Sequence, residues 1–131
     1  MDPLPLPIPV SEAGRCHRPW GWFETLTEGE GYRVKRLWIA AGRRISLQRH
    51  HHRCEHWVVV GGQGLIELQG TLTQAICGTS LFIPVGAIHR AAAATEALEI
   101  IEVQRGADLR EDDIERFDDD YGRVVMSLNT L

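Results

Sequence analysis

The 131-residue sequence predicts an all-β fold, either an antiparallel sandwich or a barrel. Short runs rich in β-branched and aromatic residues follow one another from position 32 to position 104. Turns that contain glycine or proline separate these runs. No stretch alternates strands with helical patterns, so a parallel sheet is not expected.

The chain is expected to begin with an arm and to continue as one domain. Four of the six prolines lie in the first ten residues. Because proline lacks the N–H that a sheet ladder needs, residues 1–14 are predicted to be an extended arm and 15–131 a single domain. The expected strands of that domain are 32–40, 44–50, 56–60, 64–68, 80–84 and 97–104.

Two of these runs, 44–50 and 56–60, are expected to pair across a short turn, with Trp57 and Val59 in the core. After residue 106 the sequence becomes acidic. Asp112 and Asp113 are typical of a short acidic-capped helix or turn packed on the sheets. The acidic run itself is interpreted as a solvated face.

Composition excludes several classes of partner. The net charge of −4 argues against non-specific binding to nucleic acid and against an anionic membrane surface. The apolar runs are too short to cross a bilayer, and the first residues lack the basic start of a secretory signal. Three cysteines without a CxxC pair favour a reduced, cytoplasmic chain.

Residues 48–57, QRHHHRCEHW, hold four of the six histidines beside one glutamate. Such a cluster is a metal site, an acid–base centre or a polar surface stretch. In a strand, Gln48, His50 and His52 would share one face, and Glu55 would open the next strand toward the same cavity. Imidazole nitrogen with carboxylate and amide oxygen favours a divalent metal, whether zinc, manganese, iron, cobalt or nickel.

A second fragment, residues 78–89, ends in another histidine after a Pro/Gly turn. Together with the spacing Q-x-H-x4-E in residues 42–62, it resembles the two motifs of the cupin superfamily, whose fold is a double-stranded β-helix or jelly roll. The resemblance implies a metal site of Gln48, His50, Glu55 and His89.

The alternation of side chains along a strand also predicts which way the other histidines point. His52 has the same parity as His50, so it is an alternative to Gln48 as a ligand. His51 and His56 are expected to point outward, away from the metal.

A narrower resemblance is to the type II mannose-6-phosphate isomerase cupin. That domain usually forms the C-terminal part of bifunctional enzymes whose other half is a mannose-1-phosphate guanylyltransferase. No Gly-rich nucleotide loop occurs here, so guanylyl transfer is not expected of these residues. The segments that carry the resemblance include RPWGWFE (18–24), ISLQRHHHRCEHWVVV (45–60), FIPVGAIHR (82–90) and EIIEVQRGADLREDDIERFDDDYGR (99–123).

This resemblance implies interconversion of mannose 6-phosphate and fructose 6-phosphate, which feeds GDP-mannose and polysaccharide synthesis. A proton would move between C1 and C2 through a cis-enediol, and a divalent cation would polarise the carbonyl. Arg53 is the first choice for a cation that binds the oxyanion, and Glu102 is the candidate base. Lys35 is a further catalytic candidate, and Lys35, Arg36 and Arg90 are alternatives for phosphate.

The sequence departs from the family after His89, where Ala91–Ala94 replace an Asn-Pro-Gly-type turn. This change is expected to lie in a loop near the mouth of the barrel. A second interpretation is therefore a non-catalytic cupin that binds a sugar or nucleotide-sugar and associates with a separate guanylyltransferase. A third, a metal-dependent oxygenase, is less favoured because such sites usually hold more histidines.

A homodimer is also predicted. Small cupins often pair their barrels edge to edge, and the apolar arm LPLPIPV has little reason to remain in water.

Overall fold

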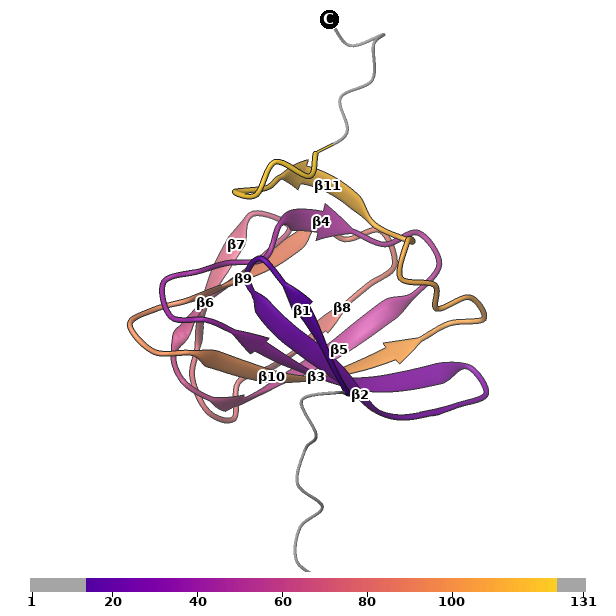
Figure 1. The fold of residues 1–131 in the computed structure, drawn as a ribbon. Helices are drawn as coiled ribbons and strands as arrows, with labels where there is room; N and C mark the ends of the chain where they lie inside the picture. Colours follow the sequence, from indigo (N-terminus) through magenta and orange to yellow (C-terminus); the bar gives the residue numbers. More distant parts are fainter. Residues whose placement is uncertain (1–13, 125–131) are drawn as a thin grey trace, which may run out of the picture.

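The computed structural model describes residues 14–124, which form eleven strands in two antiparallel sheets and contain no α-helix (Figure 1). The all-β prediction is confirmed. The larger sheet contains, in spatial order, β1 (Arg15–Arg18), β2 (Gly21–Gly29), β3 (Tyr32–Ile39), β10 (Leu98–Arg105), β5 (Cys54–Gly61) and β8 (Ser80–Ile83). The smaller contains β11 (Glu115–Asp118), β4 (Leu47–Arg49), β9 (His89–Ala93), β6 (Gly64–Leu68) and β7 (Thr71–Ala75).

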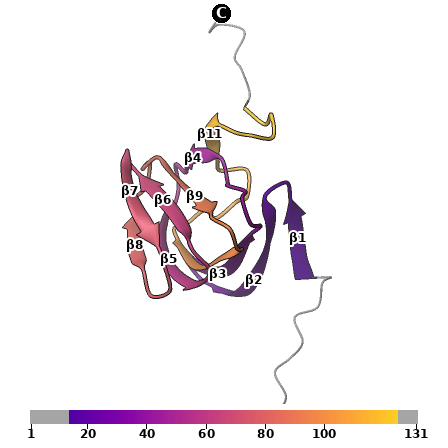
Figure 2. The ribbon, with the colours of Figure 1, turned by 90° about the vertical axis from the view of Figure 1, so that its left-hand side faces the viewer.

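The two sheets face each other across one hydrophobic core (Figure 2). Strand β5 shows why the sequence folds this way, because its side chains alternate between buried and exposed positions. Trp57 and Val59 are both 1% exposed and belong to the core, as predicted. Ile39 of the larger sheet and Ile66 of the smaller sheet are fully buried in the same core.

The predicted pairing of residues 44–50 with 56–60 is wrong. Strand β4 pairs with β9 and β11, whereas β5 pairs with β10 and β8 in the other sheet. The connection turns between sheets because the Asp113 carboxylate accepts hydrogen bonds from the backbone N–H groups of His51 and His52, each at 2.9 Å. The histidine-rich segment therefore bridges the two sheets.

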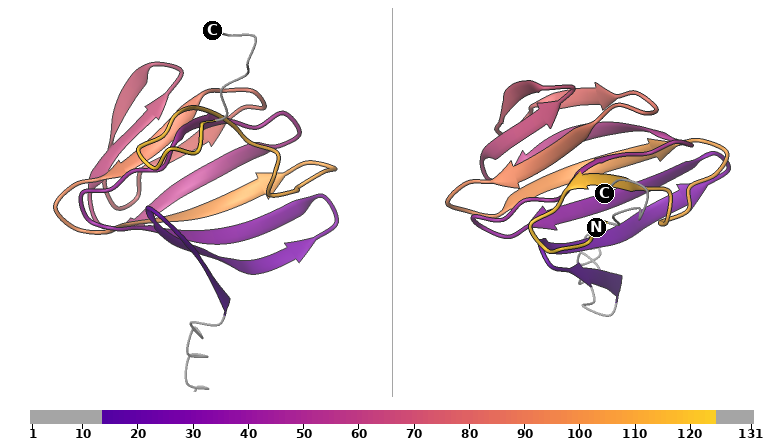
Figure 3. Two further views of the ribbon diagram at one scale, coloured as in Figure 1. Left: turned by 45° about the horizontal axis from the view of Figure 1, so that its top comes forward. Right: turned by 90° about the horizontal axis from the view of Figure 1, so that it is seen from above.

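The acidic C-terminal segment is a turn followed by a strand, and it contains no helix within the described residues. β11 pairs with β4, and in the view from above this C-terminal segment lies across the fold (Figure 3). Asp113 is only 7% exposed, so at this position the interpretation of the run as a solvated face is wrong. Its carboxylate is buried because it holds the turn after β4.

The expectation that Ala91–Ala94 form a loop is wrong for the first three residues, which belong to β9. Ala91 and Ala93 are buried in the core. The adjacent strand comes so close that a Cβ added to Gly64 would lie 1.9 Å from the carbonyl oxygen of Ala92. Small side chains therefore let the two strands pack tightly, although alanine is a weak strand former.

Two predictions stay open. Residues 1–13 of the arm lie outside the described part of the chain. The homodimer stays a prediction too. The outward faces of β5 and β8 expose Val58, Val60 and Phe82, and apolar surface of this kind is often found in contacts between subunits. Within residues 14–124 no helix is long and apolar enough to cross a bilayer.

We predict that Trp57→Ala lowers the free energy of unfolding by about 3–5 kcal/mol, because it removes a fully buried indole from the core. Urea denaturation monitored by circular dichroism measures this change. Val58→Ala on the exposed face of the same strand is the control and should cost much less. A loss below about 1 kcal/mol for Trp57→Ala would contradict the role of this side chain in the core.

Candidate metal centre and active site

Three side chains from both sheets meet inside the fold. His50 follows β4 and His89 begins β9, while Glu55 comes from β5 in the opposite sheet. His50 Nε2 lies 3.3 Å from Glu55 Oε2, and His89 Nε2 lies 3.5 Å from Glu55 Oε1. One potential ligand atom from each residue lies within 4.8 Å of the others, and all three side chains are buried.

The two imidazoles are oriented by backbone carbonyls. His50 Nδ1 lies 2.7 Å from the carbonyl oxygen of Asp113, and His89 Nδ1 lies 2.9 Å from that of Ala87. Since a carbonyl only accepts, each Nδ1 carries a proton, which leaves Nε2 as the ligand atom of the neutral ring. Backbone carbonyls commonly orient metal-binding histidines in this way.

The electrostatics of the cluster also fit a cation. Burial lowers the pKa of His50 to about 4, so its imidazole is neutral at pH 7. Burial raises the pKa of Glu55, but His89, His50 and Arg53 outweigh it and hold that pKa well below its ordinary value. His89 Nε2 is buried without a hydrogen-bond partner in the described part of the chain. A neutral imidazole, a carboxylate and an unpartnered nitrogen together suit a divalent metal.

Gln48 lies beside this group but presents its amide nitrogen to it. Gln48 Nε2 donates toward His50 Nε2 at 3.3 Å, while Ser46 Oγ donates to Gln48 Oε1 at 2.8 Å. A metal requires the amide oxygen, so the amide would have to rotate before Gln48 could act as a ligand. The ligand role of Gln48 stays a prediction.

The remaining histidines of the cluster lie at the surface. His52 is exposed. β4 ends at Arg49, so the alternation of side chains along the strand does not reach position 52. The structure therefore does not place His52 as the alternative to Gln48. As predicted, His51 and His56 point outward: His51 Nε2 lies 3.0 Å from Glu115 Oε2, and His56 packs on Phe82.

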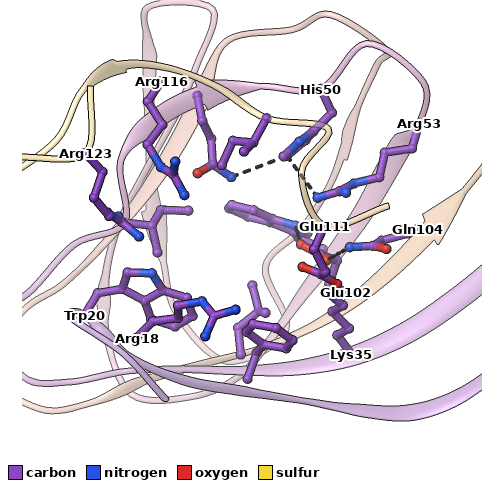
Figure 4. A pocket seen from close by; sticks show the side chains of 16 residues that line it. Arg18, Trp20, Lys35, His50, Arg53, Glu102, Gln104, Glu111, Arg116 and Arg123 are labelled. Atoms are coloured by element: carbon purple, nitrogen blue, oxygen red, sulfur yellow. Dashed lines mark hydrogen bonds and ion pairs between the residues drawn. The ribbon is translucent and has the colours of Figure 1, made fainter. Parts of the chain in front are cut away.

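Arg53 is buried and touches two of the three potential ligands. Its Nε donates to Glu55 Oε2 at 2.8 Å, and its NH2 group lies 3.2 Å from His50 Nε2. The guanidinium also lines a cavity between the sheets (Figure 4). The sequence indicated Arg53 as the cation for the oxyanion, and the structure places its guanidinium beside the potential metal ligands.

Glu102 and Lys35 line the same cavity, and both are almost fully buried. They face each other across β10 and β3. The Trp57 indole N–H donates to Glu102 Oε2 at 2.9 Å and to Glu55 Oε1 at 3.2 Å, so it bridges the two carboxylates. Gln104 donates to Glu102 Oε1 at 2.7 Å. The Lys35 ammonium is bound to Glu111 and lies over the Phe23 ring.

Burial and the nearby Glu55 carboxylate raise the pKa of Glu102 to about 7, against the opposing charges of Arg53 and Lys35. A carboxyl group that titrates near neutral pH can both accept and return a proton under physiological conditions. A raised pKa is what the base expected from the sequence requires, and the catalytic role of Glu102 stays a prediction.

The other two arginines considered for phosphate lie outside the cavity. Arg36 points to the opposite face of β3 and pairs with Glu24 and Glu99. Arg90 donates to the carbonyl oxygen of Ile45 and pairs with Asp118. Neither guanidinium lines the cavity, and the phosphate role expected of these two arginines stays a prediction.

Sequence reasoning missed several residues that line the cavity, because they are distant from both motifs. Gln104 could have been found, since it lies two residues after Glu102 on the same face of a strand. The others come from the two ends of the described chain, and no spacing rule connects them to the motifs. They are Arg18, Trp20, Glu111, Arg116 and Arg123.

We predict that Glu102→Gln removes part of the pH dependence of stability. Because folding raises the pKa of Glu102 from 4.5 to about 7, this group stabilises the fold fully below pH 4.5, and that stabilisation is lost as the pH rises through 7. At about 1.4 kcal/mol per pKa unit, the loss is about 3 kcal/mol. Urea titrations of metal-free protein at pH 5 and pH 8 measure it, and identical pH profiles for native protein and variant would contradict it.

Comparison with known proteins agrees with this architecture. The family model for the C-terminal region of mannose-6-phosphate isomerase matches residues 10–119. The chain belongs to this family. The membership predicted from the two motifs and the acidic segment is confirmed.

Relatives of this isomerase C-terminal domain include much longer proteins. The chain is 43% identical over 109 residues to the mannose-1-phosphate guanylyltransferase ManC of Salmonella typhimurium, covering 82% of this chain and 23% of that protein. It is 44% identical over 110 residues to the alginate biosynthesis protein AlgA of Pseudomonas aeruginosa, covering 83% and 23%. The chain thus spans about a quarter of the length of these relatives.

Solved structures support the cupin fold of this family member. A structure described as DMSP lyases RdDddP and RnDddQII has a TM-score of 0.66 at 21% identity, covering 86% of this chain and 61% of that one. An RmlC-like cupin from Shewanella frigidimarina has a TM-score of 0.61 at 20% identity, covering 70% and 78%. At these identities the similarity establishes the fold, and the predicted cupin jelly roll is confirmed.

Proposed function

We propose that this domain is a metal-dependent aldose–ketose isomerase that interconverts mannose 6-phosphate and fructose 6-phosphate. One observation carries the proposal: His50 of the potential metal centre, Glu102 with a pKa of about 7 and the buried Arg53 line a single cavity. Membership of the mannose-6-phosphate isomerase C-terminal family supports the choice of substrate.

The reaction moves one proton between C1 and C2 of the open-chain sugar. Glu102 takes the proton from one carbon and returns it to the other, while a hydroxyl proton passes between the two oxygens. Its carboxylate is held for this task by Trp57 and Gln104, each of which binds one of its oxygens. A group with a pKa near the operating pH is efficient in both directions.

Charge develops on the sugar oxygens when the carbon-bound proton leaves. Arg53 is positioned to stabilise that charge, because its guanidinium lines the cavity and is anchored by Glu55. A divalent cation held by His50, Glu55 and His89 supplies Lewis acidity toward the sugar oxygens when it is bound. Arg53, Glu55 and Glu102 are buried, and the low local dielectric strengthens each of these interactions.

The alternative is a non-catalytic module that binds a sugar or nucleotide-sugar. In the sequence, the altered turn after His89 favoured this binding module. Ala91–Ala93 belong instead to a buried strand, so the change does not remodel the cavity mouth. The buried Glu102, with its raised pKa, favours an enzyme, because ionisable groups with perturbed pKa values in cavities cluster at catalytic sites.

The test is a coupled assay with purified, metal-loaded full-length chain and mannose 6-phosphate. Fructose 6-phosphate is converted to glucose 6-phosphate and oxidised, and NADPH is followed by its absorbance. Turnover that is lost in chelator and restored by added metal is expected. Protein that retains its metal and binds mannose 6-phosphate without any turnover would reject the isomerase and favour the binding module.

A further inference from the structure

Three arginines line the cavity without a role in the proposed proton transfer. Arg18 ends β1, Arg116 lies in β11, and Arg123 follows that strand. In Figure 4 their guanidinium groups point into the cavity from the side away from Arg53. Arg18 is far in sequence from Arg116 and Arg123. The packing of β11 on β4, together with the β1–β2 hairpin, brings all three to one wall.

The positive charge of this wall is only partly compensated. Arg123 makes a two-point contact with the buried Asp119 carboxylate, at 2.8 and 2.9 Å. Arg116 Nε is buried without a hydrogen-bond partner among residues 14–124. Arg18 donates to the carbonyl oxygen of His17, its neighbour in sequence. Among residues 14–124, Arg123 is thus the one member of the three that forms an ion pair.

The arginines are close enough to repel one another. Burial, Arg123 and Arg18 all lower the pKa of Arg116, against the opposing effect of Asp119. The effects of Arg123 and Arg18, which come after that of burial, indicate a positive environment around Arg116. Such repulsion is relieved when an anion binds between the groups, and the planar fork of arginine matches the oxygens of a phosphate.

We propose that Arg18, Arg116 and Arg123 bind the phosphate group of a phosphorylated sugar. This places the reacting carbons at the other side of the cavity, beside Arg53 and Glu102. Anion binding follows from the arginines alone, whereas its identity as the phosphate of the substrate rests on the proposed function.

The cations expected from the sequence to bind phosphate are less suited to it. Lys35 lines the cavity, but its ammonium is bound to Glu111. The guanidinium groups of Arg36 and Arg90 pair with carboxylates outside the cavity. Since Lys35, Arg53 and Arg123 each pair with a carboxylate, the uncompensated positive charge among the described residues of the cavity belongs to Arg18 and Arg116.

The test is isothermal titration of metal-free full-length protein with inorganic phosphate. Arg18→Gln and Arg116→Gln are each expected to weaken binding roughly 10- to 100-fold, because each removes one charge-assisted contact. Arg105→Gln is the matched control: it makes the same change in net charge at an exposed position at the end of β10, outside the cavity. It should bind phosphate like the native chain.

Equal affinity in the native chain and all three variants would overturn the site, as would a native chain that binds no phosphate at millimolar concentration. Arg18 is exposed on an edge strand, so Arg18→Gln gives an answer even if Arg116→Gln fails to fold. Arginine-dependent phosphate binding without turnover of mannose 6-phosphate would reject the isomerase and keep the site. If the native chain turns over mannose 6-phosphate, Arg18→Gln and Arg116→Gln should each increase KM by a much larger factor than they decrease kcat.

Discussion

Replacing His50 or His89 with alanine is expected to abolish stoichiometric binding of Zn²⁺. Each imidazole presents an Nε2 lone pair to the same small volume, and each is fixed there by a carbonyl bonded to its Nδ1. Loss of groups that merely orient a ligand typically weakens metal binding 10- to 100-fold, so loss of a ligand itself should exceed roughly 100-fold. Competition with a fluorescent chelator measures the affinity.

The control variants are His51→Ala and His56→Ala, which remove the same side chain from positions that point outward. Both should bind Zn²⁺ as the native chain does. Equal loss in His51→Ala and His50→Ala would mean that the histidine run chelates metal at the surface. The buried cluster would then have a structural role, with Glu55 paired to Arg53.

The sequence predicts those parts of the fold that follow from local periodicity. Alternation in β5 indicated that Trp57 and Val59 are buried, because a strand turns successive side chains to opposite faces. It could not predict that β4 and β5 lie in different sheets. That arrangement depends on Asp113, about sixty residues away in sequence, whose carboxylate holds the turn between them.

The same distinction applies to the site. His50, Glu55 and His89 come from two motifs whose spacing is informative, and the structure brings all three together. The arginine wall comes from the two ends of the described chain, and only the finished fold brings its members to one cavity. Charge alone did not separate these arginines from others on the surface, because the chain has thirteen arginines and a single lysine.

Arg53→Ala is expected to remove isomerase activity while Zn²⁺ binding is kept. In the structure the Arg53 guanidinium contacts Glu55 Oε2 and His50 Nε2, two atoms of the potential metal centre. Its removal frees both atoms for the metal, so affinity should stay the same or rise. Loss of a positive group that stabilises developing charge should lower kcat by roughly 100- to 1,000-fold.

Arg53→Lys and added guanidinium distinguish a direct role from an indirect one. Lysine keeps the charge but not the planar fork, so partial activity is expected. Guanidinium chloride at non-denaturing concentration should restore part of the activity to Arg53→Ala by occupying the space that the side chain leaves. Parallel loss of Zn²⁺ and activity in Arg53→Ala, without rescue, would show that Arg53 acts by holding Glu55 in place and not by contacting the sugar.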